Sequence, residues 1–429
     1  MANIKKYLFL IVLLLLSSCS HDSSTHSNLS AFTLDDHAAG ISERINNISN
    51  LTIVSKDEND LRAEYRAGFI QGKMQAQAIL SSRDNYWDLA YLLDPGHSFP
   101  KQHGPTRAEL DAAGVILNQN YNYFIQYLRD NAGTDAADKL TRLLFRMLGI
   151  YHGATLAGPA EINISGSWLP DADYFRPEEL VLGYETSSVT FMDIYYMNSF
   201  CDLMDVISFS TEAGSKRGRI DKCSASVSRT DDDIIITHNS WFGYLSQTLA
   251  VTLYINGDFL TVNAISPGLV GSGSDFGYNN KGIMFNETTH RASYTEPKTD
   301  AIWSFWRSTL AEQFSTSIND FFNYISVDNS GTYLNGYMIV DSKANETGLV
   351  EMSYRCFVYY LSDGGPYAVS TKSMDGGSCS ADYDHEMLTE DYIMGINYPA
   401  STQVKNDLQS TDNRPARRRQ FKEMLPDVR

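Results

Sequence analysis

Three side chains suited to acyl chemistry stand in the second half of the sequence: Cys223, His238 and Asn329. A cysteine attacks a carbonyl carbon only as the thiolate, and an ordinary thiol with a pKa of about 8.5 therefore needs a base. An imidazole titrates near neutrality and can orient the nucleophile or stabilise developing charge. An asparagine amide can donate a hydrogen bond to the oxyanion of a tetrahedral intermediate. Each of these residue types could therefore serve a reaction that begins with a cysteine nucleophile.

Self-cleavage before Cys223 would create the base that the thiol needs. If the peptide bond between Lys222 and Cys223 breaks, the new α-amine has a pKa of about 8 and lies on the same residue as the thiol. The expected route is attack of the Cys223 thiol on the Lys222 carbonyl, an N-to-S acyl shift, and hydrolysis of the thioester. The mature enzyme would repeat this attack on its substrate.

Each candidate residue also has a structural interpretation. A cysteine at the start of a strand commonly packs, a histidine is often a buried structural residue, and Asn329 opens an Asn-Ser-Gly-Thr-Tyr turn that it can cap. Among residues with a supporting role, Trp241 can wall an acyl pocket or belong to the core. Thr288 and Thr289 can lend hydroxyls to the site or pack in a strand. Arg355 can hold a negative group or lie exposed on a strand.

The elements that must position these side chains change in type near Gly218. From about Leu51 to Gly218 the apolar spacing is that of amphipathic helices, including stretches at about 106–131, 136–156 and 187–208. Short β-rich runs follow at 234–236, 249–255, 259–265 and 281–285, then a helix at about 301–325 and strands at 336–341, 349–353 and 356–361. Asn256-Gly257 predicts a hairpin between two of the runs. This order predicts antiparallel sheets covered by helices, with Cys223 at the start of a strand.

The first residues predict export. Lys5 and Lys6 precede an apolar run of about ten residues, which is too short to span a bilayer. The Leu-Ser-Ser-Cys that follows resembles a bacterial lipobox, so we expect a signal peptide over 1–18 and a lipid on Cys19. A cleaved signal with a chance cysteine is the alternative. A lipidated tether over 19–50 would hold the protein in the cell envelope, at the periplasmic or outer-membrane face, unless it is secreted.

Charge and cysteine content narrow the classes of partner. With 52 acidic against 34 basic residues, the net charge of −18 repels polyanions, and nucleic acid is not expected to bind. The five cysteines form no Cys-x-x-Cys pair, and no histidine cluster has metal-ligand spacing, so we expect neither a metal nor an organic cofactor. If Cys19 is lipidated and Cys223 is the nucleophile, one disulfide can form among Cys201, Cys356 and Cys379, and the sequence does not choose its partners.

Several segments resemble the phospholipase B-like family, in the family's own order. Cys223-Ser224-Ala225, an apolar strand, and His238-Asn239-Ser240-Trp241 resemble the start of its catalytic chain, Cys-Ser-Ala, a strand and His-x-x-Trp. The most specific match is 329–341, where this chain has Asn-Ser-Gly-Thr-Tyr-Leu-Asn-Gly-Tyr-Met-Ile-Val-Asp. Its family counterpart reads Asn-Ser-Gly-Thr-Tyr-Asn-Asn-Gln-Trp-Met-Ile-Val-Asp. Looser matches lie at 65–72, 266–268, 274–278, 282–289 and 395–399. The chain differs from the family pattern at Gln71, Leu334, Gly336 and Tyr337, so the resemblance does not extend to substrate specificity.

The resemblance implies an α+β, four-layer αββα N-terminal-nucleophile hydrolase fold. A mainly helical N-terminal chain over 51–222 would wrap a catalytic chain over 223–429. Cys223 would be the nucleophile with the Asn329 side chain beside it, acting on an acyl lipid or an N-acyl amide. Two alternatives stay open: a catalytically silent surface lipoprotein that binds lipid or protein, and an acyltransferase of the same fold that differs only in its acceptor.

Overall fold

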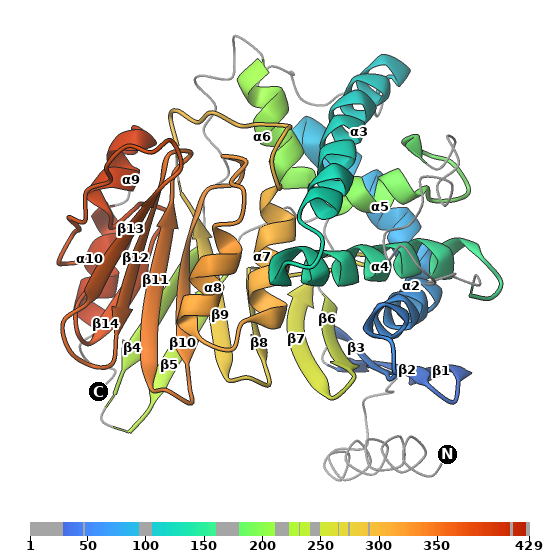
Figure 1. Ribbon diagram of the computed structural model, residues 1–429, viewed down its shortest axis with the longest axis horizontal. Coiled ribbons are helices and arrows are strands. Elements are labelled where there is room, and N and C mark those ends of the chain that lie inside the picture. Colours follow the sequence, from blue (N-terminus) through green and yellow to red (C-terminus); the bar gives the residue numbers. More distant parts are fainter. Residues whose placement is uncertain are drawn as a thin grey trace.

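The protein has a mixed α+β structure, as the sequence predicts. The computed structural model describes residues 29–45, 48–93, 105–159, 180–210, 223–230, 232–240, 249–264, 266–272, 275–290, 292–411 and 415–425. Figure 1 shows a broad sheet with a layer of helices packed against it. Of the helices in these ranges, none has both the length and the apolar composition needed to cross a membrane. The predicted signal peptide and Cys19 lie outside the described residues.

Eleven strands form one large sheet in the order β1-β2-β3-β6-β7-β8-β9-β10-β11-β12-β13. Their bounds are β1 Ser30–Asp35, β2 Ala38–Ile45, β3 Ile48–Ser55, β6 Leu249–Ile255, β7 Asp258–Ala264, β8 Phe276–Asn279, β9 Ile283–Thr289, β10 Asn335–Asp341, β11 Glu346–Met352, β12 Cys356–Ser362 and β13 Ala368–Ser373. Neighbours pair antiparallel, except that β3 and β6 are parallel. The predicted hairpin joins β6 to β7, where Asn256 and Gly257 both have the positive φ, 53° and 94°, of a tight two-residue turn.

A second sheet of three antiparallel strands carries the predicted nucleophile. It consists of β14 (Tyr392–Gly395), β4 (Ser224–Arg229) and β5 (Ile234–Asn239), with β4 in the centre. Apolar side chains from both sheets, among them Val227, Ile393 and Met338, belong to one buried cluster. Cys223 immediately precedes β4, so the prediction of a cysteine at the start of a strand is confirmed.

The helices lie mainly against the large sheet. They are α2 (Asp60–Leu93), α3 (Arg107–Asp130), α4 (Asp135–Thr155), α5 (Phe191–Asn198), α6 (Phe200–Ser210), α7 (Ser304–Phe314) and α8 (Ile318–Ile325). Two further helices, α9 (Thr402–Asp407) and α10 (Pro415–Met424), lie beside β12 to β14 at the far end of the molecule in Figure 1.

Helices α2 and α4 approach each other backbone to backbone. A Cβ atom placed on Gly68 would lie 2.1 Å from the Arg146 carbonyl oxygen, and one placed on Gly149 would lie 2.1 Å from the Tyr65 carbonyl oxygen. The buried Arg146 guanidinium then pairs with Glu64 across the two helices, at 2.6 Å between Nη2 and Oε2. Glycine is required at these crossings because no side chain fits between the helices.

Two parts of the chain differ from the sequence-based expectation. Residues 30–45 and 48–50, expected within the tether, belong to β1, β2 and β3. Leu51 and Ile53 of β3 are buried in alternation, and the strand is held by its parallel pairing with β6, which lies far along the sequence. The helix expected over 301–325 is two helices, because α7 ends at Phe314 and the Ser317 hydroxyl accepts a hydrogen bond from the Asp320 amide to begin α8.

Among the described residues, the structure joins Cys356 to Cys379 by a disulfide and leaves Cys201 and Cys223 outside it. Replacing both Cys356 and Cys379 with serine is expected to lower the free energy of unfolding by about 3 kcal/mol, because the bridge restricts a loop in the unfolded chain. Urea denaturation of the oxidised protein would measure this loss. Wild-type protein that has been reduced should match the double variant, and an unchanged midpoint in the oxidised variant would show that the bridge contributes no stability.

Candidate functional site

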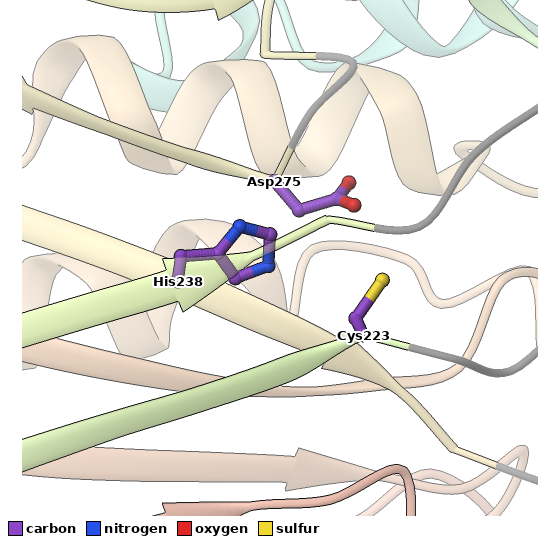
Figure 2. A group of neighbouring side chains, drawn as sticks. All are labelled: Cys223, His238 and Asp275. Atoms are coloured by element: carbon purple, nitrogen blue, oxygen red, sulfur yellow. The ribbon is translucent and has the colours of Figure 1, made fainter. Parts of the chain in front are cut away.

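The structure brings the Cys223 thiol, the His238 imidazole and the Asp275 carboxyl group together (Figure 2). The sulfur, one ring nitrogen and one carboxyl oxygen all lie within 4.8 Å of one another. Cys223 precedes β4, His238 lies on the adjacent β5 with its Cα opposite that of Ala225, and Asp275 precedes β8 of the large sheet. Figure 2 shows the Cys223 sulfur and the Asp275 carboxyl group pointing into the same space beside the imidazole ring. The site therefore lies where the two sheets meet.

The His238 ring is held in one tautomer. Its Nε2 lies 3.0 Å from the Glu287 carbonyl oxygen, which can only accept, so Nε2 carries the hydrogen and Nδ1 carries the lone pair. Nδ1 is buried and has no hydrogen-bond partner among the described residues. Burial lowers the pKa of His238 to about 4, against the smaller opposing effect of the Glu287 carbonyl. At neutral pH the ring is uncharged, and Nδ1 keeps its lone pair.

Asp275 belongs to a buried pair of carboxyl groups. Burial raises its pKa to about 7, although hydrogen bonds with Glu287 and Tyr333 act in the opposite direction. Burial and the neighbouring Asp275 raise the pKa of Glu287 well above its ordinary value. The Tyr333 hydroxyl donates toward both carboxyl groups, at 3.3 Å from Asp275 Oδ1 and 3.2 Å from Glu287 Oε1. The low-dielectric surroundings disfavour two adjacent negative charges, so one proton stays on the pair at neutral pH.

The carbonyl group of Cys223 is fixed by α10. Arg417 Nη1 donates to the Cys223 carbonyl oxygen at 2.7 Å and to Asn397 Oδ1 at 2.9 Å. Asn397, with φ of 61°, donates its Nδ2 hydrogen to the Thr289 carbonyl oxygen at 2.9 Å. A chain of hydrogen bonds therefore runs from β9 through Asn397 and Arg417 to the backbone of the nucleophile.

Asn329 is placed in the turn that its sequence predicts. Its Nδ2 donates to the Ser353 carbonyl oxygen at 3.0 Å, and its Oδ1 accepts from the Gly331 amide at 3.0 Å. Both ends of the amide thus hold the turn before β10, in agreement with the structural interpretation. A role as oxyanion donor stays a prediction.

The remaining predicted residues divide by location. Thr288 and Thr289 are buried in β9, and the Thr289 hydroxyl donates to Glu287 Oε1 at 3.3 Å, which links it to the carboxyl pair. Arg355 lies on the surface and pairs with Asp375 at 3.0 Å, so its observed partner is not in the site. Trp241 and Lys222 lie outside the described residues.

Sequence reasoning missed Asp275, Glu287, Asn397 and Arg417 as members of the site. Asp275, Glu287 and Asn397 stand in segments that match the family only loosely, 274–278, 282–289 and 395–399, and Arg417 lies in none of the matched segments. An isolated Asp or Arg in a loop or helix carries no signal of its own. What places these residues together is the stacking of the two sheets.

Comparisons with known proteins identify the family of the chain. The family model for phospholipase B matches residues 178–414, which is more than half of the chain. Human phospholipase B-like 1 is 28% identical over 180 residues, covering 37% of this chain and 32% of the human protein. Phospholipase B-like protein B of Dictyostelium discoideum is 25% identical over 180 residues, and phospholipase-B 81 of Drysdalia coronoides is 24% identical over 202 residues. These alignments cover 36% and 40% of this chain and 31% and 36% of those relatives, so the chain spans about a third of the length of each. The chain belongs to the phospholipase B family.

Proposed function

We propose that this protein is an exported, self-processing cysteine hydrolase of the N-terminal-nucleophile class that cleaves an amide or ester bond of an acyl substrate. The observation that carries the proposal is the grouping of Cys223, His238 and Asp275 within 4.8 Å at the start of β4. Cleavage before Cys223 would leave its thiol and its new α-amine side by side in this group. Two sheets that share one buried cluster near β4, with helices packed on the large sheet, support the proposed four-layer fold.

The reaction would begin with attack of Cys223 Sγ on the substrate carbonyl carbon while the α-amine takes the thiol proton. Collapse of the tetrahedral intermediate breaks the amide or ester bond, and the departing amine or alcohol takes the proton back from the ammonium group. Water then attacks the thioester, releasing the acid and restoring the thiol. The uncharged His238 adds no positive charge beside the ammonium group, and the proton held between Asp275 and Glu287 limits the negative charge beside the thiolate.

An apolar surface adjoins the candidate nucleophile. The Phe276 ring lies 5.6 Å from the His238 ring, centre to centre, and is 38% exposed. Tyr278, two residues along β8 on the same face, is 46% exposed. Exposed aromatic rings at a reactive group suit an acyl chain, so we propose a phospholipid or an N-acyl amide as the substrate. A lipid on Cys19 would hold the enzyme at a membrane, where such substrates are concentrated.

Intact mass and N-terminal sequencing of the purified protein test the processing step. We expect two chains, the second beginning at Cys223. Incubation with phosphatidylcholine vesicles and with N-acyl amides, with free fatty acid measured by mass spectrometry, then tests hydrolysis. A single uncut chain that releases no fatty acid would contradict the proposal and favour a lipid-binding protein, whereas acyl transfer to an added amine in preference to water would favour an acyltransferase.

Arg417→Ala is expected to slow both processing and hydrolysis by about 100-fold, because the carbonyl of the nucleophile loses the guanidinium that fixes it. Arg419→Ala is the matched control, since this side chain of the same helix is 73% exposed. Circular dichroism would establish that both variants fold. Equal rates for the two variants would show that Arg417 does not position Cys223.

A further inference from the structure

We propose that Cys223, His238 and Asp275 form a binding site for Zn²⁺, and that the bound cation blocks the nucleophile. The three side chains supply a thiol, an imidazole nitrogen and a carboxyl oxygen, which are the donor types that zinc binds in proteins. The ion would fill the space into which the sulfur and the carboxyl group both point in Figure 2. Inhibition by Zn²⁺ rests on the proposed function of Cys223 as the nucleophile, whereas the binding of Zn²⁺ does not.

The distances fit a zinc site after a small contraction. Zinc bonds of about 2.3 Å to sulfur and about 2.0 Å to nitrogen and oxygen place neighbouring tetrahedral donors roughly 3.3 to 3.6 Å apart. The donors of this group lie within 4.8 Å of one another, and side-chain rotation alone could close that gap. Three protein ligands leave a fourth position, which the α-amine of a processed Cys223 would fill as a chelate with its own sulfur.

The state of His238 also fits a metal ligand. Zinc binds the neutral imidazole through the nitrogen that carries the lone pair. In this ring that nitrogen is Nδ1, which is buried and has no partner among the described residues. The other nitrogen donates to the Glu287 carbonyl oxygen at 3.0 Å, the outer contact that commonly fixes the orientation of a ligating histidine.

Groups behind the site favour a cation. Glu287 and Tyr333 hold the Asp275 carboxyl group from the side of the large sheet, in the way that outer hydrogen bonds hold ligating carboxylates.

When the ion binds, it replaces the proton of the Cys223 thiol and any proton on Asp275, and these pass to solvent. No electron transfer is involved, and the thiolate lone pair is no longer available to attack a carbonyl carbon.

Cobalt titration of the full-length protein tests this site without any activity measurement. Co²⁺ is expected to bind with a one-to-one stoichiometry and to give a sulfur-to-cobalt charge-transfer band that added Zn²⁺ removes. The band should be absent from Cys223→Ser. The affinity for Co²⁺ should be at least tenfold weaker in His238→Ala and in Asp275→Asn. Cys201→Ala is the matched control, because Cys201 is the other described cysteine outside the disulfide, and it should keep the band.

Alkylation of the wild-type protein provides a second readout that needs no variant. Stoichiometric Zn²⁺ should slow the reaction of Cys223 with iodoacetamide, as measured by peptide mass spectrometry. An absent band, a band lost in Cys201→Ala instead, or unchanged alkylation of Cys223 would overturn the zinc site. A processed, hydrolysing protein that binds no Co²⁺ would refute this inference alone, and an unprocessed protein that binds Co²⁺ through Cys223 would refute the proposed function alone.

Discussion

Replacing Cys223 with alanine is expected to leave the chain uncut and to lower the rate of acyl hydrolysis by on the order of 10⁶-fold. The substitution removes the thiol that would form the thioester, while the neutral His238 and the carboxyl pair stay in place. Intact mass and fatty-acid release would be measured on the same preparation. Cys223→Ser should retain slow processing, because a hydroxyl group can make the same attack with a weaker nucleophile.

The control for this experiment is Cys201→Ala, because Cys201 is the other described cysteine outside the disulfide. Burial raises the pKa of the Cys201 thiol well above its ordinary value, and the nearby carboxylates add to this, so Cys201 stays protonated and unreactive. We expect Cys201→Ala to process and hydrolyse like the wild type. Hydrolysis by Cys223→Ala at the wild-type rate would remove Cys223 from the mechanism.

Gly68→Ala and Gly149→Ala are each expected to destabilise the fold by about 3 kcal/mol or more, a large effect for the addition of one methyl group. Each new Cβ would stand 2.1 Å from a backbone carbonyl oxygen of the facing helix, so α2 and α4 would have to separate. Separation would also strain the buried ion pair between Glu64 and Arg146. Urea denaturation followed by circular dichroism measures the loss.

Gly114→Ala provides the comparison for these variants. This glycine lies in α3, where a Cβ would meet only the Leu182 Cδ1 atom, at 3.9 Å. Alanine is the better helix former, so this variant should be as stable as the wild type or more stable by up to about 1 kcal/mol. If all three variants showed the same stability, close packing of α2 on α4 would not be a source of stability.

Local patterns in the sequence predicted the elements better than their partners. The amphipathic spacing predicted α3 and α4 nearly to their ends, and Asn256-Gly257 predicted the hairpin, because both signals lie within a few residues. The parallel pairing of β3 with β6 joins segments far apart in the chain, and no local signal reports it. Cys223 and His238 were recognised through their motif, whereas Asp275 reaches them from the other sheet and could be found only in three dimensions.

The pairing of β3 with β6 requires that the chain fold before it is cut at Cys223. If the chain is cut before Cys223, β1 to β3 and helices α2 to α6 belong to one fragment, and the other strands belong to the second. The sheet then runs unbroken across two separate polypeptides, held by backbone hydrogen bonds and a shared core. The Cys356–Cys379 disulfide lies wholly within the second fragment, so it does not join the two. The mature protein would be an obligate heterodimer that assembles only once, as a single chain, and its durability would depend on how slowly it unfolds.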